Sequence, residues 1–184
     1  GLVAALLPLA LRRGATLGEF IDAFVLGYEV GARCGAWLPI RRGMHVDANW
    51  PALGVAACAA RVLGLAPAGI DQAIDIAACQ LATSLYLPVR EGRTARNTYL
   101  GHSATLGLQA AFASAAGIDA PAGALAHYAL QHAAPTGQAL PGADVALLRD
   151  AYIKPFAAVR HVHYGAAAAR KLRTQLEGGG TTGI

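Results

Sequence analysis

The sequence predicts a mainly α-helical protein, in which a helical bundle rich in small residues is followed by one strand and one helix of a second, α+β domain. Hydrophobic residues make up 55% of the 184 residues, while aromatic residues make up 7% and charged residues 14%. The apolar content is therefore mostly alanine, leucine and valine, the composition of closely packed helices. Several segments also place apolar residues at helical spacing.

The first two helices with clear boundaries are expected over 17–37 and 51–64. Thr16 and Glu19 have the spacing of a capping box, and apolar residues follow them at helical intervals. Pro51 suits the first turn of the second helix, and Gly64 can supply its left-handed stop.

Further helices are expected over 68–84 and 102–116, with a polar loop between them. The segments 52–65 and 105–118 repeat one another at a leading Leu-Gly, at several alanines and at a later glycine. Because small residues at such spacing let helix backbones approach closely, we expect paired helices in one compact bundle.

The helical pattern weakens after about residue 118, where prolines and glycines surround a further helix expected over 122–132. We expect a boundary near 140–150, which gives an incomplete helical domain over 1–145 and the start of an α+β domain over 146–184. In the second part, 151–164 is rich in strand formers and 165–176 reads as helix. The closing "GGGTTGI" is typical of a linker.

No segment contains the roughly 20 consecutive apolar residues that a membrane-spanning helix needs. The opening "GLVAALLPLAL" follows no basic segment and precedes no small-residue cleavage site, so it does not fit a signal peptide. We therefore expect a cytoplasmic protein. Cys34, Cys58 and Cys79 each fall within an apolar helical pattern, which predicts reduced thiols in the core.

The net charge of +4 is spread over separate basic clusters at 12–13, 41–42, 90–96 and 154–173. This arrangement favours a small anionic ligand over a nucleic-acid backbone. Arginine and lysine can hold carboxylates, and histidines can move protons near pH 7.

Four segments, in this order, resemble the MmgE/PrpD family: "GYEVGARCG", "GMHVDANWPALGVAACAARVLGL", "RNTYLGHSATLGLQAAFASAAGI" and "YIKPFAAVRHVHYGAAAARKL". That family includes 2-methylcitrate dehydratase, cis-aconitate decarboxylase and iminodisuccinate epimerase. The resemblance implies an internal fragment of a longer protein, in which an all-α domain stands beside an α+β lid domain with the active site in the cleft between them. It also implies a homodimer and a cofactor-free reaction of a small polycarboxylate.

The resemblance assigns roles to several residues. His45 matches an active-site histidine, His163 matches a histidine expected to act as acid or base, and Lys154 matches a lysine that either binds substrate or packs at the domain junction. Arg96 stands where the dehydratase and the decarboxylase carry a lysine; arginine can bind a carboxylate but is a poor acid or base. Arg160 is a second candidate for holding a carboxylate.

Other readings of these residues remain open. On the residues alone, His45 is a loop histidine that caps the helix over 51–64, and Arg96 and Arg93 are solvated loop arginines. Asn97 and Tyr99 can add hydrogen bonds to substrate, and His102 can cap a helix.

The remaining polar residues have simpler interpretations. Glu29 is expected to be a buried partner of Arg33, while His127 and His132 are expected at the surface. His161 and His163 share one face if their segment is extended, a geometry that can bind metal, but no third ligand is near in the sequence, so we expect no metal.

Two functions follow. The first is a cofactor-free lyase or isomerase acting on a small di- or tricarboxylate by dehydration, decarboxylation or epimerisation, in which His45 and His163 move protons and Arg96 and Lys154 hold carboxylates. The second is a truncated, inactive helical module of the same fold that acts structurally or in oligomerisation. We expect no nucleic-acid partner and no membrane contact.

Overall fold

The computed structural model describes residues 1–132, 142–156 and 158–178. It divides into two compact units, Gly1–Arg149 and Asp150–Ile184, which are described separately here. The prediction of a mainly α-helical fold is confirmed, since helices account for most of the described residues. Most of the linker-like end, residues 179–184, lies outside the described residues.

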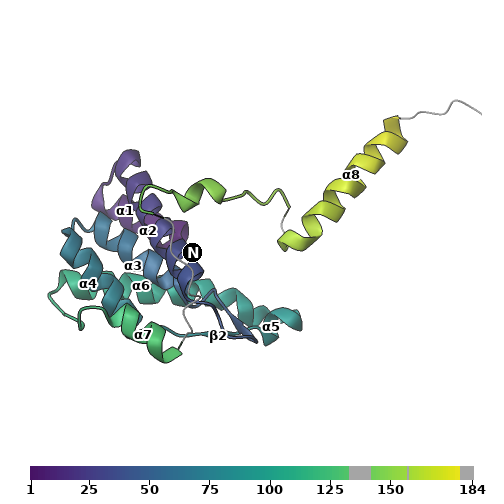
Figure 1. The fold of residues 1–184 in the computed structure, drawn as a ribbon. Helices are drawn as coiled ribbons and strands as arrows, with labels where there is room; N and C mark the ends of the chain where they lie inside the picture. The colour runs from purple at the N-terminus through teal and green to yellow at the C-terminus, as the bar shows by residue number, and fades with distance from the viewer. Residues whose placement is uncertain (133–141, 157, 179–184) are drawn as a thin grey trace, which may run out of the picture. The chain divides into compact units, whose positions relative to one another are not determined.

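The first unit is a bundle of helices (Figure 1). Its α-helices are α1 (Leu2–Arg13), α2 (Leu17–Trp37), α3 (Trp50–Val62), α4 (Pro67–Ala78), α5 (Leu87–Arg90), α6 (Tyr99–Ala115) and α7 (Ala124–His132). The first unit also contains the short 3-10 helix η1 (Thr94–Thr98). A second 3-10 helix, η2 (Leu147–Asp150), spans the division between the two units in the chain.

Helix α3 lies at the centre of this bundle, packed against α1, α2, α4 and α6. All its residues from Ala52 to Ala60 are buried. Because alanine and glycine occupy most of these positions, helices can approach α3 from several sides. The paired packing expected for the two repeated segments is confirmed, since they form α3 and α6 and these helices contact one another.

Glycines mark the closest approaches to α3. A Cβ atom added to Gly27 on α2 would lie 2.6 Å from the carbonyl oxygen of Gly54, and one added to Gly107 on α6 would lie 2.6 Å from the carbonyl oxygen of Ala52. A side chain at either position would force the facing backbone of α3 to move. The bundle therefore depends on backbones that lie almost in contact.

The predicted helix boundaries hold for α2 and α3. The Thr16 hydroxyl accepts a hydrogen bond from the N–H of Glu19, whose carboxylate in turn accepts one from the N–H of Thr16, which is the expected capping box. After α3 the chain turns at Gly64 with φ +79°, the left-handed conformation expected there.

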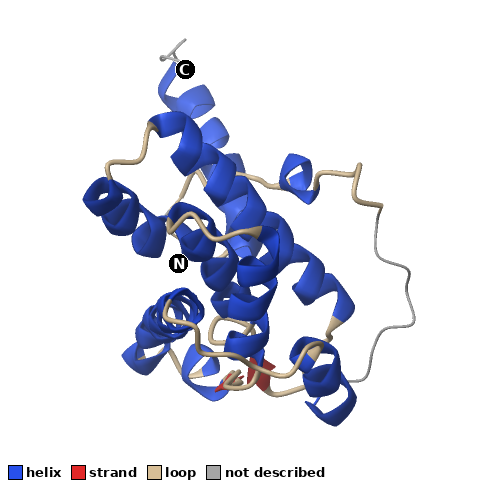
Figure 2. Ribbon diagram, turned by 90° about the vertical axis from the view of Figure 1, so that its left-hand side faces the viewer, coloured by secondary structure: helices blue, strands red, loops and turns tan. Residues whose placement is uncertain are grey.

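The helix expected over 68–84 is shorter than predicted. It ends at Ala78, and residues Ser84–Leu85 form strand β2, which pairs antiparallel with β1 (Met44–His45) (Figure 2). The backbone groups of Ser84–Leu85 are satisfied by pairing with a segment forty residues earlier instead of by a continued helix. Helix α6 begins at Tyr99, three residues earlier than expected, and the preceding polar loop contains α5 and η1.

The cysteine prediction is correct for two thiols and wrong for the third. Cys34 and Cys58 are buried, whereas Cys79 is exposed because α4 ends immediately before it. Burial raises the pKa of Cys34 to about 11 and that of Cys58 to about 12.

The second unit contains η3 (Arg160–Val162) and α8 (His163–Gly178). The extended strand expected over 151–164 is wrong, since the described residues there form irregular chain, the η3 turn and the start of α8. Strand formers need a neighbouring strand, and none pairs with this segment among the described residues.

None of the helices in the described part of the chain combines the length and the apolar character needed to cross a membrane.

Candidate functional site

His45 lies on the short β1–β2 ribbon, between two tyrosines. Its side chain is 16% exposed. The imidazole stacks on Tyr86, with ring centroids 5.8 Å apart and planes at 16°, and lies 6.1 Å from the tilted ring of Tyr99. His45 does not cap α3, whose N-cap residue is Asn49. The ribbon and the tyrosines therefore fix the plane of the ring.

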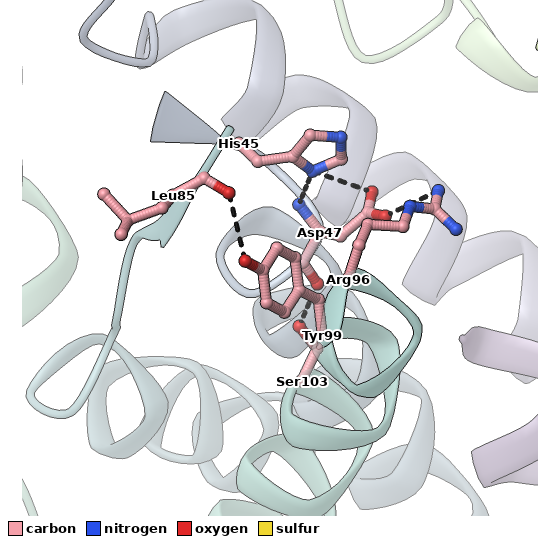
Figure 3. Close-up of polar contacts among 6 residues, drawn as sticks. All are labelled: His45, Asp47, Leu85, Arg96, Tyr99 and Ser103. Atoms are coloured by element: carbon pink, nitrogen blue, oxygen red, sulfur yellow. Dashed lines mark hydrogen bonds and ion pairs between the residues drawn. The ribbon is translucent and has the colours of Figure 1, made fainter. Parts of the chain in front are cut away.

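Asp47 contacts His45 in two ways (Figure 3). Its backbone N–H donates a hydrogen bond to Nδ1 of His45 over 3.2 Å, and its carboxylate oxygen Oδ1 lies 3.6 Å from the same nitrogen. The Asp47 side chain is 15% exposed. A largely buried carboxylate needs a cationic or hydrogen-bonding partner.

Arg96 supplies that partner from η1, the short helix before α6. Its Nη2 lies 3.1 Å from Oδ2 of Asp47. The Arg96 side chain is 43% exposed, so part of the guanidinium remains open to solvent. Because arginine carries five N–H donors, one contact with Asp47 leaves others available for a ligand.

Two side chains from the first turns of α6 form hydrogen bonds with backbone carbonyls near His45. The Tyr99 hydroxyl donates to the carbonyl of Leu85 over 3.0 Å, and the Ser103 hydroxyl donates to the carbonyl of Asp47. Ser103 is fully buried. These bonds tie strand β2 and the segment directly after β1 to one helix.

The cluster of His45, Asp47, Arg96 and Tyr99 thus places an imidazole and a guanidinium on opposite oxygens of one carboxylate. Chemically, this arrangement can orient an imidazole and offer a cation to a bound anion. The sequence prediction did not name Asp47, Tyr86 or Ser103. Asp47 had a usable signal, because it stands two residues after His45 on the same polar segment, whereas Ser103 had none.

Two polar residues of the loop lie away from these contacts. Asn97 is exposed on η1. The Arg93 side chain is 75% exposed, with its Nε 3.9 Å from Glu91, as expected for a solvated loop arginine. His102 is exposed in the first turn of α6, which begins before it.

The other predicted site residues belong to the second unit. His163 is 8% exposed at the start of α8, where its Nε2 lies 3.1 Å from the carbonyl oxygen of Ala158 and its ring meets Phe156 edge-on at 5.4 Å. Lys154 and Arg160 are exposed, and the guanidinium of Arg160 lies 5.5 Å from the centre of the Tyr152 ring.

The shared face expected for His161 and His163 is not found, because their segment is helical rather than extended. His161 is exposed while His163 is buried. Among residues 1–132, 142–156 and 158–178, no three His, Cys, Asp or Glu side chains are grouped so that they could hold a metal ion.

The predicted pairing of Glu29 with Arg33 is confirmed by a 3.3 Å contact on α2. Burial raises the pKa of Glu29, but hydrogen bonds from the N–H groups of Leu148 and Leu147 and the charge of Arg33 outweigh burial, and the pKa lies below its ordinary value. His127 is exposed as expected, while the side chain of His132 lies outside the described residues.

Comparison with known proteins supports the resemblance seen in the sequence. The model of the MmgE/PrpD N-terminal domain matches residues 1–139, which include His45, Asp47, Arg96 and Tyr99. No curated protein and no solved structure gives a significant match. Since the matched region covers well over half of the 184 residues, the chain belongs to the MmgE/PrpD family.

Proposed function

We propose that this protein is a cofactor-free lyase or isomerase that acts on a small di- or tricarboxylate. The observation that carries the proposal is the placement of His45 and Arg96 on the two oxygens of the Asp47 carboxylate. Membership of a family that includes dehydratases supports the same class of reaction. The specific acid and the bond that breaks belong to the proposal as alternatives: dehydration, decarboxylation or epimerisation.

The chemistry starts with the substrate's carboxylates. Removal of a proton next to a carboxylate gives an enediolate, whose negative charge develops on the carboxylate oxygens. A guanidinium beside those oxygens lowers the energy of that state, because it binds two oxygens through parallel N–H groups. Arg96 keeps exposed N–H groups for this contact while one nitrogen remains on Asp47.

The remaining roles extend the proposal to the second unit. His163 is the candidate acid or base, and Lys154 and Arg160 are candidates for holding a second carboxylate. Asn97 and Tyr99 are candidates for hydrogen bonds to substrate; the Tyr99 hydroxyl already donates to Leu85, so it would offer its lone pairs. A homodimer and a cytoplasmic location remain predictions from the sequence.

The alternative function is an inactive helical module. The pairing of Arg96 with Asp47 is consistent with this alternative, because an arginine that pairs with a carboxylate has a structural role even without a substrate. An inactive module would bind none of the acids at this site and would still fold.

The test is proton exchange and turnover measured by ¹H NMR in D₂O, with 2-methylcitrate, cis-aconitate and related acids offered one at a time. We expect loss of substrate signal, or exchange of a C–H next to a carboxylate for deuterium. His45→Gln should slow the reaction by about a hundredfold or more, as loss of a proton-transfer or polarising group does. Arg96→Met should raise KM, because it removes the carboxylate contact.

His102→Gln and Arg93→Gln are the matched controls, since both residues are exposed near the cluster and take no part in it. We expect both variants to keep full activity. A folded chain that neither exchanges nor converts any of these acids would support the inactive module and reject the enzyme.

A further inference from the structure

We infer that Asp47 and Ser103 are positioning residues that hold neutral His45 in a single tautomer, with its ring proton on Nε2. The inference rests on the proposed function, because it says which atom of His45 faces a reacting substrate. It concerns residues that the family match does not single out, and each step follows from contacts around the ring.

The first step is the hydrogen bond at Nδ1. The N–H of Asp47 donates to that nitrogen over 3.2 Å. A ring nitrogen that accepts a hydrogen bond carries no proton, so in the neutral ring the proton is on Nε2. The Asp47 carboxylate lies 3.6 Å from Nδ1, which is too long for the competing Nδ1–H bond.

The second step is the anchoring of residue 47. Its carbonyl accepts a hydrogen bond from the buried Ser103, and its carboxylate pairs with Arg96 over 3.1 Å. The backbone and side chain of Asp47 are therefore both fixed by the α6 region. Fixing residue 47 also fixes its N–H, the group that selects the tautomer.

The Asp47 carboxylate could draw the ring proton to Nδ1, but its other oxygen is paired with Arg96, which weakens this attraction. Tyr86 and Tyr99 present aromatic surface to His45, and the Tyr99 hydroxyl is engaged with Leu85. Ser84 is the residue directly opposite His45 across the ribbon. The charged groups near the ring are the Asp47 carboxylate and, beyond it, the Arg96 guanidinium.

A consequence for the reaction follows. A ring whose lone pair at Nδ1 is engaged cannot take the proton from the substrate carbon. It offers an Nε2–H, which can donate a hydrogen bond to the oxygen where the enediolate charge develops. The proton from carbon then goes to a different base, and His45 stabilises the resulting anion without gaining a proton. Asp47 and Ser103 act through His45 and touch no reacting atom.

The experiment is a long-range ¹H–¹⁵N correlation spectrum of the ¹⁵N-labelled chain, at a pH where its histidines are neutral. The spectrum of His45→Gln identifies the His45 signals by their absence, and free histidine in the same buffer gives the reference ratio of tautomers. We expect a ratio that favours Nε2–H over Nδ1–H by about tenfold more than in free histidine, the effect of one hydrogen bond on an equilibrium. A ratio equal to the reference, or a proton on Nδ1, would overturn the inference.

Variants separate the contributions of the two residues. Asp47→Asn keeps the backbone N–H and the carbonyl that Ser103 anchors, and it removes the negative charge beside Nδ1, so it should keep the proton on Nε2. A switch to Nδ1–H in this variant would reject the assignment to the backbone N–H. Ser103→Ala should move the ratio toward that of free histidine. Thr105→Ala is its control, because the exposed Thr105 hydroxyl also donates to a backbone carbonyl of α6, that of Gly101, and should leave the ratio unchanged.

Circular dichroism establishes that each variant is folded, and Ser103→Cys, which keeps a weak donor, serves if the alanine variant unfolds; it should shift the ratio in the same direction by less. The tautomer ratio requires no turnover. A chain with the expected ratio and no activity would keep this inference and reject the proposed function, whereas an active chain with the reference ratio would do the opposite.

Discussion

Arg96 and His45 never touch one another, yet both contact the carboxylate of Asp47, at 3.1 Å and 3.6 Å from its two oxygens. The position of each side chain therefore depends on the same anion. Because the Asp47 side chain is 15% exposed and that of Arg96 is 43% exposed, the aspartate is the fixed member of the pair and the arginine is the adjustable one.

Replacing Arg96 with alanine should destabilise the fold by about 1 kcal/mol, since it leaves a largely buried carboxylate without its cation. The measurement is the free energy of unfolding in urea. Arg93→Ala is the matched control, because its side chain is 75% exposed and its contact with Glu91 is long; it should change stability by no more than a few tenths of a kcal/mol. Equal effects of the two variants would contradict a special role for the Asp47–Arg96 pair.

The glycines of α6 provide a test of the close packing. Gly107→Ala would place a Cβ 2.6 Å from the carbonyl oxygen of Ala52 and 2.5 Å from Cβ of Val55, and should cost roughly 1–3 kcal/mol or more. Gly101→Ala, on the same helix, meets nothing within 4 Å, and should raise stability by about 0.5–1 kcal/mol through better helix propensity. Thermal unfolding of both variants checks the prediction, which fails if their midpoints move in the same direction.

The lowered pKa of Glu29 predicts a pH dependence of stability. A carboxyl whose pKa is lower in the folded state contributes stability that is present above its unfolded value of 4.5 and is lost as the pH falls through the lower folded value. The melting temperature should therefore fall below about pH 4.5, and Glu29→Gln should reduce this fall. Glu91→Gln removes an exposed carboxyl and is the comparison. Identical acid profiles for wild type and Glu29→Gln would show that the hydrogen bonds of Glu29 do not stabilise the fold.

The three thiols should react at very different rates. Cys79 is exposed, whereas burial raises the pKa of Cys34 to about 11 and that of Cys58 to about 12, which leaves little thiolate at these two sites near neutral pH. In the native chain, Ellman's reagent should therefore titrate one thiol quickly, and Cys79→Ser should abolish this fast phase. A fast phase that persists in Cys79→Ser would mean that a buried thiol becomes accessible through local opening.

Local patterns in the sequence were enough to predict the helices whose ends are marked by capping residues, proline or glycine. The capping box at Thr16 and the proline and glycine around α3 act on nearby backbone groups, so their effect is visible in a short stretch of sequence. The end of α4 and the β1–β2 pair were missed because pairing of Met44 with Leu85 joins segments far apart in the chain. The prediction of a strand over 151–164 was wrong because strand-forming residues do not make a sheet without a partner strand.

The site was only partly predictable. His45, Arg96 and Tyr99 were identified from a polar segment before an apolar helix and from the family resemblance. The contact that organises them was not, because helices α3, α4 and α5 and strand β2 separate Asp47 from Arg96 in the chain. The roles proposed for His163, Lys154 and Arg160 remain predictions.

The alanine-lined interior around α3 also determines how disturbances spread through the protein. Alanine has no rotatable side-chain torsion, so an interior built from it loses almost no rotamer entropy on folding, but it also has no alternative rotamers with which to accommodate an added atom. Any enlargement there must displace a whole helix. Strand β1, which carries His45, lies only a few residues before α3. A larger residue deep in the bundle would displace α3 and so move the main chain at His45. Substitutions in this core would therefore alter the geometry of the β1–β2 ribbon.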